Sequence, residues 1–266
     1  RSTPLSTLFP YTTLFRSNIL NMLDMSGITI RASERGEDEP IIMAGGPCAY
    51  NPEPLYDIVD FFEIGEGEEM MDDVLEVYAK HKANGKVNKK EFLREISHIG
   101  GIYVPSLYDV SYNEDGTIRE FTPKYEDVPA KVKKRIVNNF DKVSFPDEMI
   151  VPYTDIVHDR VVLETARGCT NGCRFCQAGM IYRPVREKTT NTLIEQARKA
   201  LKATGYDEVS LASLSICDYS NIQNLISSLV LEHEADKVGI ALPSFRVDAF
   251  SVDLIKEIQK VRKTGL

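Results

Sequence analysis

Three of the five cysteines stand close together, at Cys169, Cys173 and Cys176, in the pattern Cys-x-x-x-Cys-x-x-Cys. Three thiolates on one short loop can hold three corners of a 4Fe-4S cluster and leave the fourth iron open to a substrate. Zinc is the main alternative, but closed zinc sites use four ligands, commonly as two Cys-x-x-Cys pairs. A disulfide with one spare thiol is the other alternative, and such close spacing would strain it. The pattern favours an iron–sulfur site.

The residues just before the cysteines predict the element that positions them. Arg160–Ala166 is a short run rich in β-branched residues, and Gly168 follows it, which is typical of a buried strand. The cysteines therefore lie on a loop that leaves the carboxyl end of a strand. Parallel α/β folds usually place their chemistry there.

The chain beyond the cysteines alternates between helical and strand-like patterns. Together with the strand at Arg160, it predicts three strand–helix units, which would form the opening half of a (β/α) barrel. On this interpretation a fourth strand would begin near Leu266, so we expect the chain to be truncated there. The predicted helices are 192–203, 221–230 and 252–262, and the further strands are 208–212 and 237–243.

An α/β pattern also precedes the cysteine region. Strand-like runs at 40–44 and 60–64 each end in glycines, and helical patterns follow them at 51–59 and 69–81, which is the order of a doubly wound parallel sheet. A short helix is expected at 18–25, another at 88–99, and a hairpin with an Asp-Gly turn over 107–121.

These patterns divide the chain into four parts. Residues 1–17 resemble translated sequencing-adaptor sequence, with an ordinary disordered N-terminus as the alternative, so we exclude them from the fold. Residues 18–85 form an N-terminal α/β domain and residues 86–158 a connector with the helix and the hairpin. Residues 159–266 form the domain that carries the cysteines.

The bulk composition excludes several classes of protein. The formal net charge is −8, which does not indicate general adhesion to nucleic acid. No run approaches the roughly 20 apolar residues needed to span a bilayer, so we expect no membrane partner. Clustered thiols in a cysteine-poor chain are typical of a reducing compartment, and we expect a cytoplasmic protein.

The cysteine region resembles the signature of the radical S-adenosylmethionine (SAM) superfamily. Besides the three cysteines, an aromatic residue, Phe175, directly precedes the last of them, as in that superfamily. The longer string from Arg167 to Glu187 is similar to the branch that carries an N-terminal cobalamin-binding-like domain. The resemblance implies a 4Fe-4S cluster on Cys169, Cys173 and Cys176, and SAM as the second cofactor. It also implies a one-electron donor of the flavodoxin or ferredoxin type.

The resemblance further implies which residues bind SAM. Phe175 would pack by the adenine, and Ser213 and Ser215 end the second strand, where the superfamily contacts the SAM amine, often through Gly-Gly-Glu. Ser-Leu-Ser departs from that pattern. Ser244 and Arg246 would meet the SAM carboxylate or ribose, with a surface ion pair as the alternative for Arg246.

Basic residues and a further thiol near the loop have two interpretations each. Arg183, Arg186 and Lys188 would meet an anionic substrate such as RNA, or would balance the charge of the cluster and pair with Glu187. Cys217 is interpreted as an incidental small residue, with an auxiliary thiol as the alternative.

The N-terminal region resembles the C-terminal half of a flavodoxin-like Rossmann domain that binds cobalamin. The resemblance includes the turn Gly45-Gly46 and the run that starts at Gly65. The first half of such a domain would precede Asn18, and Pro47-Cys48 replaces a histidine that often follows the glycines. We therefore keep cobalamin as a third cofactor alongside a purely topological role for the turn.

Together these observations predict a radical SAM enzyme that cleaves SAM reductively, with an undetermined substrate. The fold would be α/β: a truncated flavodoxin-like domain followed by the first half of a partial TIM barrel. One alternative is an RNA-modifying methylthiotransferase-like enzyme, which would need three further cysteines before the connector, where only Cys48 is present. The other is a non-catalytic zinc or iron–sulfur binding module.

Overall fold

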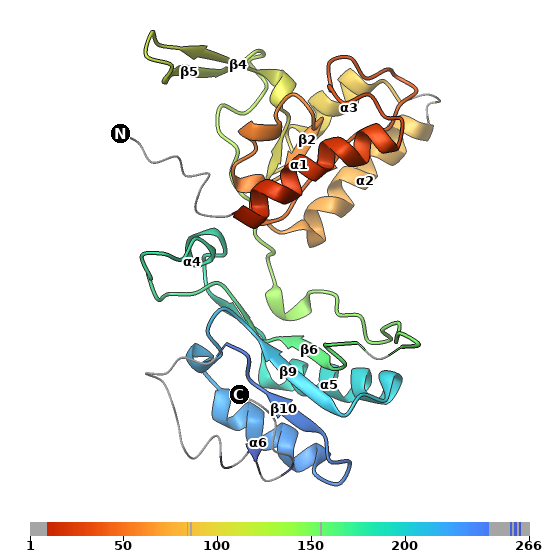
Figure 1. The fold of residues 1–266 in the computed structure, drawn as a ribbon, viewed down its shortest axis with the longest axis vertical. Helices are drawn as coiled ribbons and strands as arrows, with labels where there is room; N and C mark the ends of the chain where they lie inside the picture. Colours follow the sequence, from red (N-terminus) through yellow and green to blue (C-terminus); the bar gives the residue numbers. More distant parts are fainter. Residues whose placement is uncertain are drawn as a thin grey trace. The chain divides into compact units, whose positions relative to one another are not determined.

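The computed structural model describes residues 10–83, 85, 87–154, 156–244, 256, 258–259 and 261, with side chains described from Asn18 onward. The chain divides into two compact units, Arg1–Val137 and Asn138–Leu266. Figure 1 shows that each unit combines a small sheet with helices. The protein is therefore α/β in both of its parts.

A three-stranded mixed sheet in the order β1-β2-β3 organises unit 1. β1 runs parallel to β2, so Met43 pairs with Phe61, whereas β3 is antiparallel to β2. The helices α1, α2 and α3 flank this sheet (Figure 1). The elements are α1 Pro10–Met25, β1 Met43–Ala44, β2 Phe61–Glu63, α2 Gly67–Ala83, α3 Lys89–Ile96 and β3 Ile102–Tyr103.

Several N-terminal elements differ from the sequence prediction. The first helix begins at Pro10 and not at Asn18, so part of the segment excluded from the fold is helical. Where a helix was expected at 51–59, the structure has a 3-10 helix, η3, over Glu53–Leu55. Residues 56–58, between η3 and β2, form turns. The antiparallel strand β3 was not predicted.

The residues predicted as a connector belong largely to unit 1. Phe92 and Ile96 of α3 are fully buried with Phe62 and Met70, and Tyr103 of β3 stacks on Phe62 with ring centroids 6.0 Å apart. The expected hairpin is present as β4, Tyr108–Tyr112, and β5, Ile118–Pro123. The boundary between the units therefore falls after Val137, because the shared core extends that far along the chain.

Unit 2 contains a parallel sheet in the order β10-β9-β6. The helices α5 and α6 contribute Leu193, Leu225 and Ile226, all fully buried, to one core with Val161 and Leu163 of β6. The strands and helices match the predicted positions, while most of the predicted helix 252–262 lies outside the described residues. The elements are β6 Val161–Glu164, α5 Thr190–Thr204, β9 Glu208–Ala212, α6 Ile222–His233 and β10 Gly239–Ala241.

Local sequence signals explain where α5 begins and ends. The Thr189 hydroxyl accepts a hydrogen bond from the Thr192 amide, which satisfies one of the donors left open at a helix start. Gly205, in the left-handed conformation with φ +73°, closes the other end. This helix follows the cysteine loop directly, so its fixed start also fixes where that loop ends.

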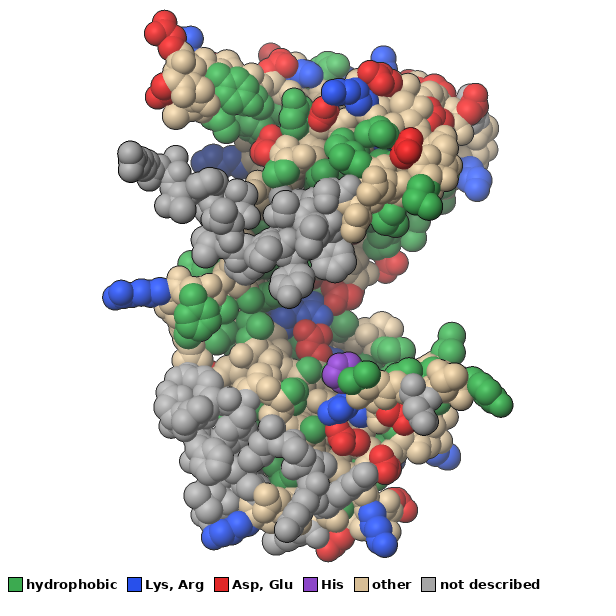
Figure 2. Space-filling view, in the orientation of Figure 1, with side chains coloured by type: hydrophobic (Ala, Val, Ile, Leu, Met, Phe, Trp, Pro, Cys, Tyr) green, Lys and Arg blue, Asp and Glu red, His purple; other side chains and the backbone are tan. Residues whose placement is uncertain are grey.

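The surface carries charges of both signs. On the face drawn in Figure 2, acidic and basic side chains are interspersed over both parts of the chain. Within the described residues, no helix combines the length and apolar character required to cross a bilayer.

Candidate iron–sulfur site

The cysteine loop is closed at its base by a short antiparallel pair that the sequence did not predict. β7, Ala166–Arg167, pairs with β8, Arg186–Glu187. The pairing brings the two ends of the loop together, so residues 168–185 leave and return at one place. The loop starts from the carboxyl end of β6, as predicted, and the short helix α4, Ala178–Ile181, lies within it.

Gly168 is required at the first position of the loop. Its φ is +90°, and a Cβ atom there would lie 2.6 Å from the Tyr182 carbonyl oxygen and 2.7 Å from that of Pro184. Any other residue would collide with the returning strand of the loop. The glycine therefore permits the close contact that closes the loop.

The three thiols differ in exposure and in their hydrogen bonds. Cys169 and Cys176 are half-buried, whereas Cys173 is exposed. The Asn171 backbone and side-chain amides both donate to Cys169 Sγ at 3.4 Å, and the Gly179 amide donates to Cys176 Sγ at 3.4 Å. Amides directed at sulfur are typical of iron–sulfur sites, where they stabilise thiolate charge.

The donor set fits an iron–sulfur cluster by its chemistry. It offers three thiols, with amide donors beside two of them. The described part of the chain contains no group of three or more His, Cys, Asp or Glu side chains arranged to hold a metal ion. The loop supplies ligands of the right type. Because the three sulfurs are not arranged around one point, cluster binding would have to bring them together.

The basic residues beside the loop do not form one exposed patch. Arg167 makes two hydrogen bonds to the Glu164 carboxylate, at 2.9 and 2.8 Å, and its guanidinium lies 4.7 Å from the Phe140 ring centre. Lys188 is only 3% exposed and also faces Phe140. Arg183 is directed back to the loop, where its Nε donates to the Cys169 carbonyl. Arg186 donates to the Pro184 carbonyl, so these cations make contacts within the loop and at its base, and recognition of an anionic substrate stays a prediction.

A buried tyrosine connects the end of the loop to the next unit of the sheet. The Tyr219 hydroxyl donates to the Lys188 carbonyl at 2.9 Å. Burial raises the pKa of the Tyr219 phenol, so the group remains a neutral donor around pH 7. Asp141 adds a second connection, because its carboxylate accepts from the Thr189 amide at 2.6 Å.

The serines predicted to contact SAM lie together at the ends of β9 and β10. The Ser244 hydroxyl donates to the Ser213 carbonyl at 2.7 Å. The hydroxyls of Ser213 and Ser215 are buried, and within the described residues they have no hydrogen-bond partner. Because buried hydroxyls are normally paired, these two atoms are available to a ligand. They are the strongest sign of a small-molecule site in this part of the structure.

Of the other residues predicted to contact SAM, only Phe175 lies within the described part of the chain. The Phe175 side chain is 87% exposed, so no pocket surrounds it. Arg246 lies outside the described residues. Cys217 packs against the core of unit 2, which favours its interpretation as a small apolar residue.

Two residues of the site were not singled out from the sequence. Asn171, between the first two cysteines, contacts Cys169, and its side chain also donates to the carboxylate of Asp218. Asp218 ends the 3-10 helix η6, Ile216–Asp218, after β9. The position of Asn171 inside the cysteine motif could have identified it from the sequence. Asp218 lies 47 residues away and has no such signal.

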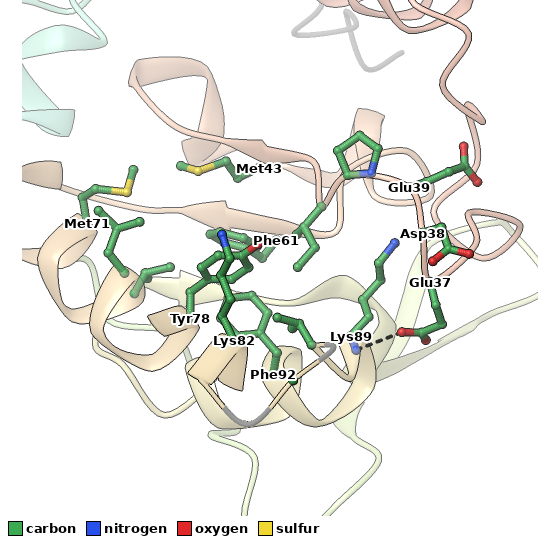
Figure 3. A pocket seen from close by; sticks show the side chains of 16 residues that line it. Glu37, Asp38, Glu39, Met43, Phe61, Met71, Tyr78, Lys82, Lys89 and Phe92 are labelled. Carbon is green, nitrogen blue, oxygen red and sulfur yellow. Dashed lines mark hydrogen bonds between the residues drawn. The ribbon is translucent and has the colours of Figure 1, made fainter. Parts of the chain in front are cut away.

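A large pocket lies elsewhere, in unit 1. It has a volume of about 710 Å³ and is lined mainly by apolar side chains of β1, β2, α2 and α3. Figure 3 shows Met43 and Phe61 across from Tyr78 and Phe92, with Lys89 at one end. Lys89 donates its ammonium to the Gly36 carbonyl. Glu37, Asp38 and Glu39 line the same end of the pocket.

Two family models match the chain. The model described as radical SAM proteins, N-terminal, matches residues 11–105. The model described as radical SAM superfamily matches residues 163–266, which include the cysteine loop and the strands β9 and β10.

The individual relatives have low sequence identity to this chain. An uncharacterised protein of Methanocaldococcus jannaschii is 27% identical over 235 residues, which cover 85% of this chain and 42% of that protein. The radical SAM methyltransferase TsrM from Kitasatospora setae, solved with cobalamin and a 4Fe-4S cluster, matches with a TM-score of 0.48 and 15% identity, over 83% of this chain and 40% of that one. The same enzyme with tryptophan and a SAM analogue gives 0.43 and 14%, over 81% and 39%. This chain therefore spans about two fifths of the relatives that it matches.

Proposed function

The chain belongs to the radical SAM superfamily, and on this basis we propose that it binds a 4Fe-4S cluster through Cys169, Cys173 and Cys176 and cleaves SAM reductively. The observation that carries the proposal is the closed loop at the carboxyl end of β6, which holds three thiols with amides directed at two of the sulfurs. When bound, such a cluster supplies the one electron that breaks a carbon–sulfur bond of SAM and releases a 5′-deoxyadenosyl radical.

The protein residues hold and orient these groups. The β7–β8 pair and Gly168 close the loop, so the thiols stay near the end of the parallel sheet. Arg167 pairs with Glu164 and so attaches the base of the loop to β6.

SAM would bind across the ends of β9 and β10. The unpaired hydroxyls of Ser213 and Ser215 support this placement, with Ser244 holding the two loops together. Phe175 would lose its exposure by covering the adenine, and Arg246 would contact the carboxylate or ribose. These assignments predict that Ser215→Ala weakens SAM binding without removing the cluster.

The proposed setting follows from the chemistry. The protein would take its electron from a flavodoxin or ferredoxin in a reducing cytoplasm, where clustered thiols persist. The substrate class stays open, with RNA as one candidate, and cobalamin is a further proposed cofactor of the N-terminal region. Absorbance spectra of the purified full-length chain incubated with cobalamin test that second point.

The decisive experiment is anaerobic reconstitution with iron and sulfide, followed by electron paramagnetic resonance of the reduced protein with and without SAM. We expect a reduced 4Fe-4S signal that changes on addition of SAM, together with formation of 5′-deoxyadenosine. Cys173→Ala should abolish the signal, whereas Cys217→Ala, a control outside the loop, should retain it.

Two outcomes would contradict the proposal. Tight binding of one zinc ion with no cluster would exclude cleavage of SAM by this protein. A cluster whose signal ignores SAM would instead support a non-catalytic iron–sulfur module.

A further inference from the structure

Asn171 makes the most direct side-chain contact with a predicted cluster ligand. Its backbone amide and its side-chain Nδ2 both lie 3.4 Å from Cys169 Sγ. Sulfur is a weak acceptor when protonated, and a thiolate accepts more strongly because it is charged. One residue therefore directs two donors at one of the three sulfurs.

A residue from another loop orients this side chain. The Asn171 Nδ2 group carries two hydrogens, so it can donate to Cys169 Sγ and to the Asp218 carboxylate at the same time. Asp218 lies on η6, whose Ile216 is fully buried, and the Asp218 amide donates to the Ser215 carbonyl at 3.2 Å. The exposed carboxylate is thus attached to a well-packed turn.

This contact joins two different strand ends. Asn171 belongs to the loop after β6, whereas Asp218 follows β9, the next strand of the sheet. Asn171 lies on a half-buried part of the cysteine loop. Its contact with Asp218 supports the rotamer that points the amide at the sulfur.

We propose that Asn171, oriented by Asp218, is a positioning residue that raises the reduction potential of the cluster held by Cys169. The inference rests on the proposed function, because it requires the cluster. Hydrogen bonds to ligand sulfurs stabilise the more negative, reduced cluster and so make reduction easier. Asp218 acts through Asn171, since its own charge would shift the potential in the opposite direction.

The first test is a redox titration of the reconstituted full-length protein, followed by electron paramagnetic resonance. Asn171→Leu keeps a similar volume but removes the side-chain donor, and we expect its midpoint potential to become more negative than that of the wild type. Thr170→Ala is the matched control, because Thr170 is an exposed neighbour on the same loop, and its potential should not change.

The second test separates the hydrogen bond of Asp218 from its charge. Asp218→Asn and Asp218→Ala both remove the charge, but only the asparagine can still accept from Asn171. We expect the alanine variant to have the more negative potential of the two. In the background of Asn171→Leu this difference should vanish, because the contact is already lost.

The outcomes distinguish the inference from the function it rests on. If wild type and Asn171→Leu load equal amounts of cluster with equal potentials, the inference is wrong while the proposed function stands. If Asn171→Leu loads no cluster, the two Asp218 variants provide the test. Equal midpoint potentials for Asp218→Asn and Asp218→Ala would then contradict the inference. A wild-type protein without a cluster would overturn both.

Discussion

Each unit has a glycine with positive φ shortly after a strand, and the two glycines have different consequences. In unit 1, Gly65 follows β2 with φ +127°, and a Cβ there would lie 2.3 Å from the Arg135 carbonyl oxygen. In unit 2, Gly168 follows β7 with φ +90°, and a Cβ there would lie 2.6 Å from the Tyr182 carbonyl oxygen. In both places a glycine allows two backbone segments to touch.

What the glycine brings together differs between the units. Gly65 lies against the last residues of unit 1, where the Arg135 amide donates to the Ile64 carbonyl and the Arg135 carbonyl accepts from Glu66. These hydrogen bonds attach residues near the end of unit 1 to the turn that follows β2. Gly168 instead closes a loop with three thiols. Both turns depend on a glycine with positive φ. The side chains of the loop decide whether the turn can support chemistry.

The largest effect is expected for Gly168→Ala. The new Cβ would approach two carbonyl oxygens within 2.7 Å, and a positive φ adds strain of about 1–3 kcal/mol for residues other than glycine. The loop should open at its base, so we expect the iron content after reconstitution to fall several-fold. Gly172→Ala is the control, because Gly172 has open space around it and should retain the cluster. Full iron loading of Gly168→Ala would show that loop closure is dispensable.

Gly65→Ala should be comparably destabilising but should leave the cluster site intact. Its Cβ would collide with the Arg135 backbone, so the free energy of unfolding should fall by about 1–3 kcal/mol. Hydrogen exchange should show faster opening in α2 and α3, while the iron content stays at the wild-type level. Equal loss of cluster in both glycine variants would break the distinction between the two turns.

Glu63, at the end of β2, provides a test that depends on pH. The residue is 6% exposed, its Oε1 has no hydrogen-bond partner among the described residues, and burial raises the pKa of the carboxyl above 4.5. Because the folded protein holds this proton more tightly than the unfolded chain, stability should fall as the pH rises above about 4.5. Glu63→Gln should weaken that decline, as measured by urea unfolding at several pH values. An unchanged pH profile would mean that other groups dominate it.

The smallest effects are expected at two helix starts, one in each unit. Asn88 accepts hydrogen bonds from the amides of Lys90 and Glu91 at the start of α3, and Thr189 accepts from Thr192 at the start of α5. Replacing either by alanine should cost about 1 kcal/mol. Hydrogen exchange should locate each loss in its own helix. Only Thr189→Ala is expected to alter the cluster signal, because α5 begins where the cysteine loop ends.

Much of the fold was predictable because its signals are local. The periodic apolar positions of α2, α3, α5 and α6 and the β-branched runs of β6 and β9 lie within a few residues of one another. The predicted hairpin also formed, with Gly116 at φ +80° in its turn. The helix expected at 51–59 is reduced to the 3-10 helix Glu53–Leu55, because its apolar signal was short.

The sequence by itself determined which residues the proposed chemistry depends on: three thiols at motif spacing, after a strand, with serines at the end of the next one. Only the tertiary structure decided how these residues are held. The β7–β8 pair joins residues about 20 positions apart, and Asp218 reaches Asn171 across 47. Such contacts leave no periodic trace in the chain, because they depend on which strand ends the sheet brings side by side.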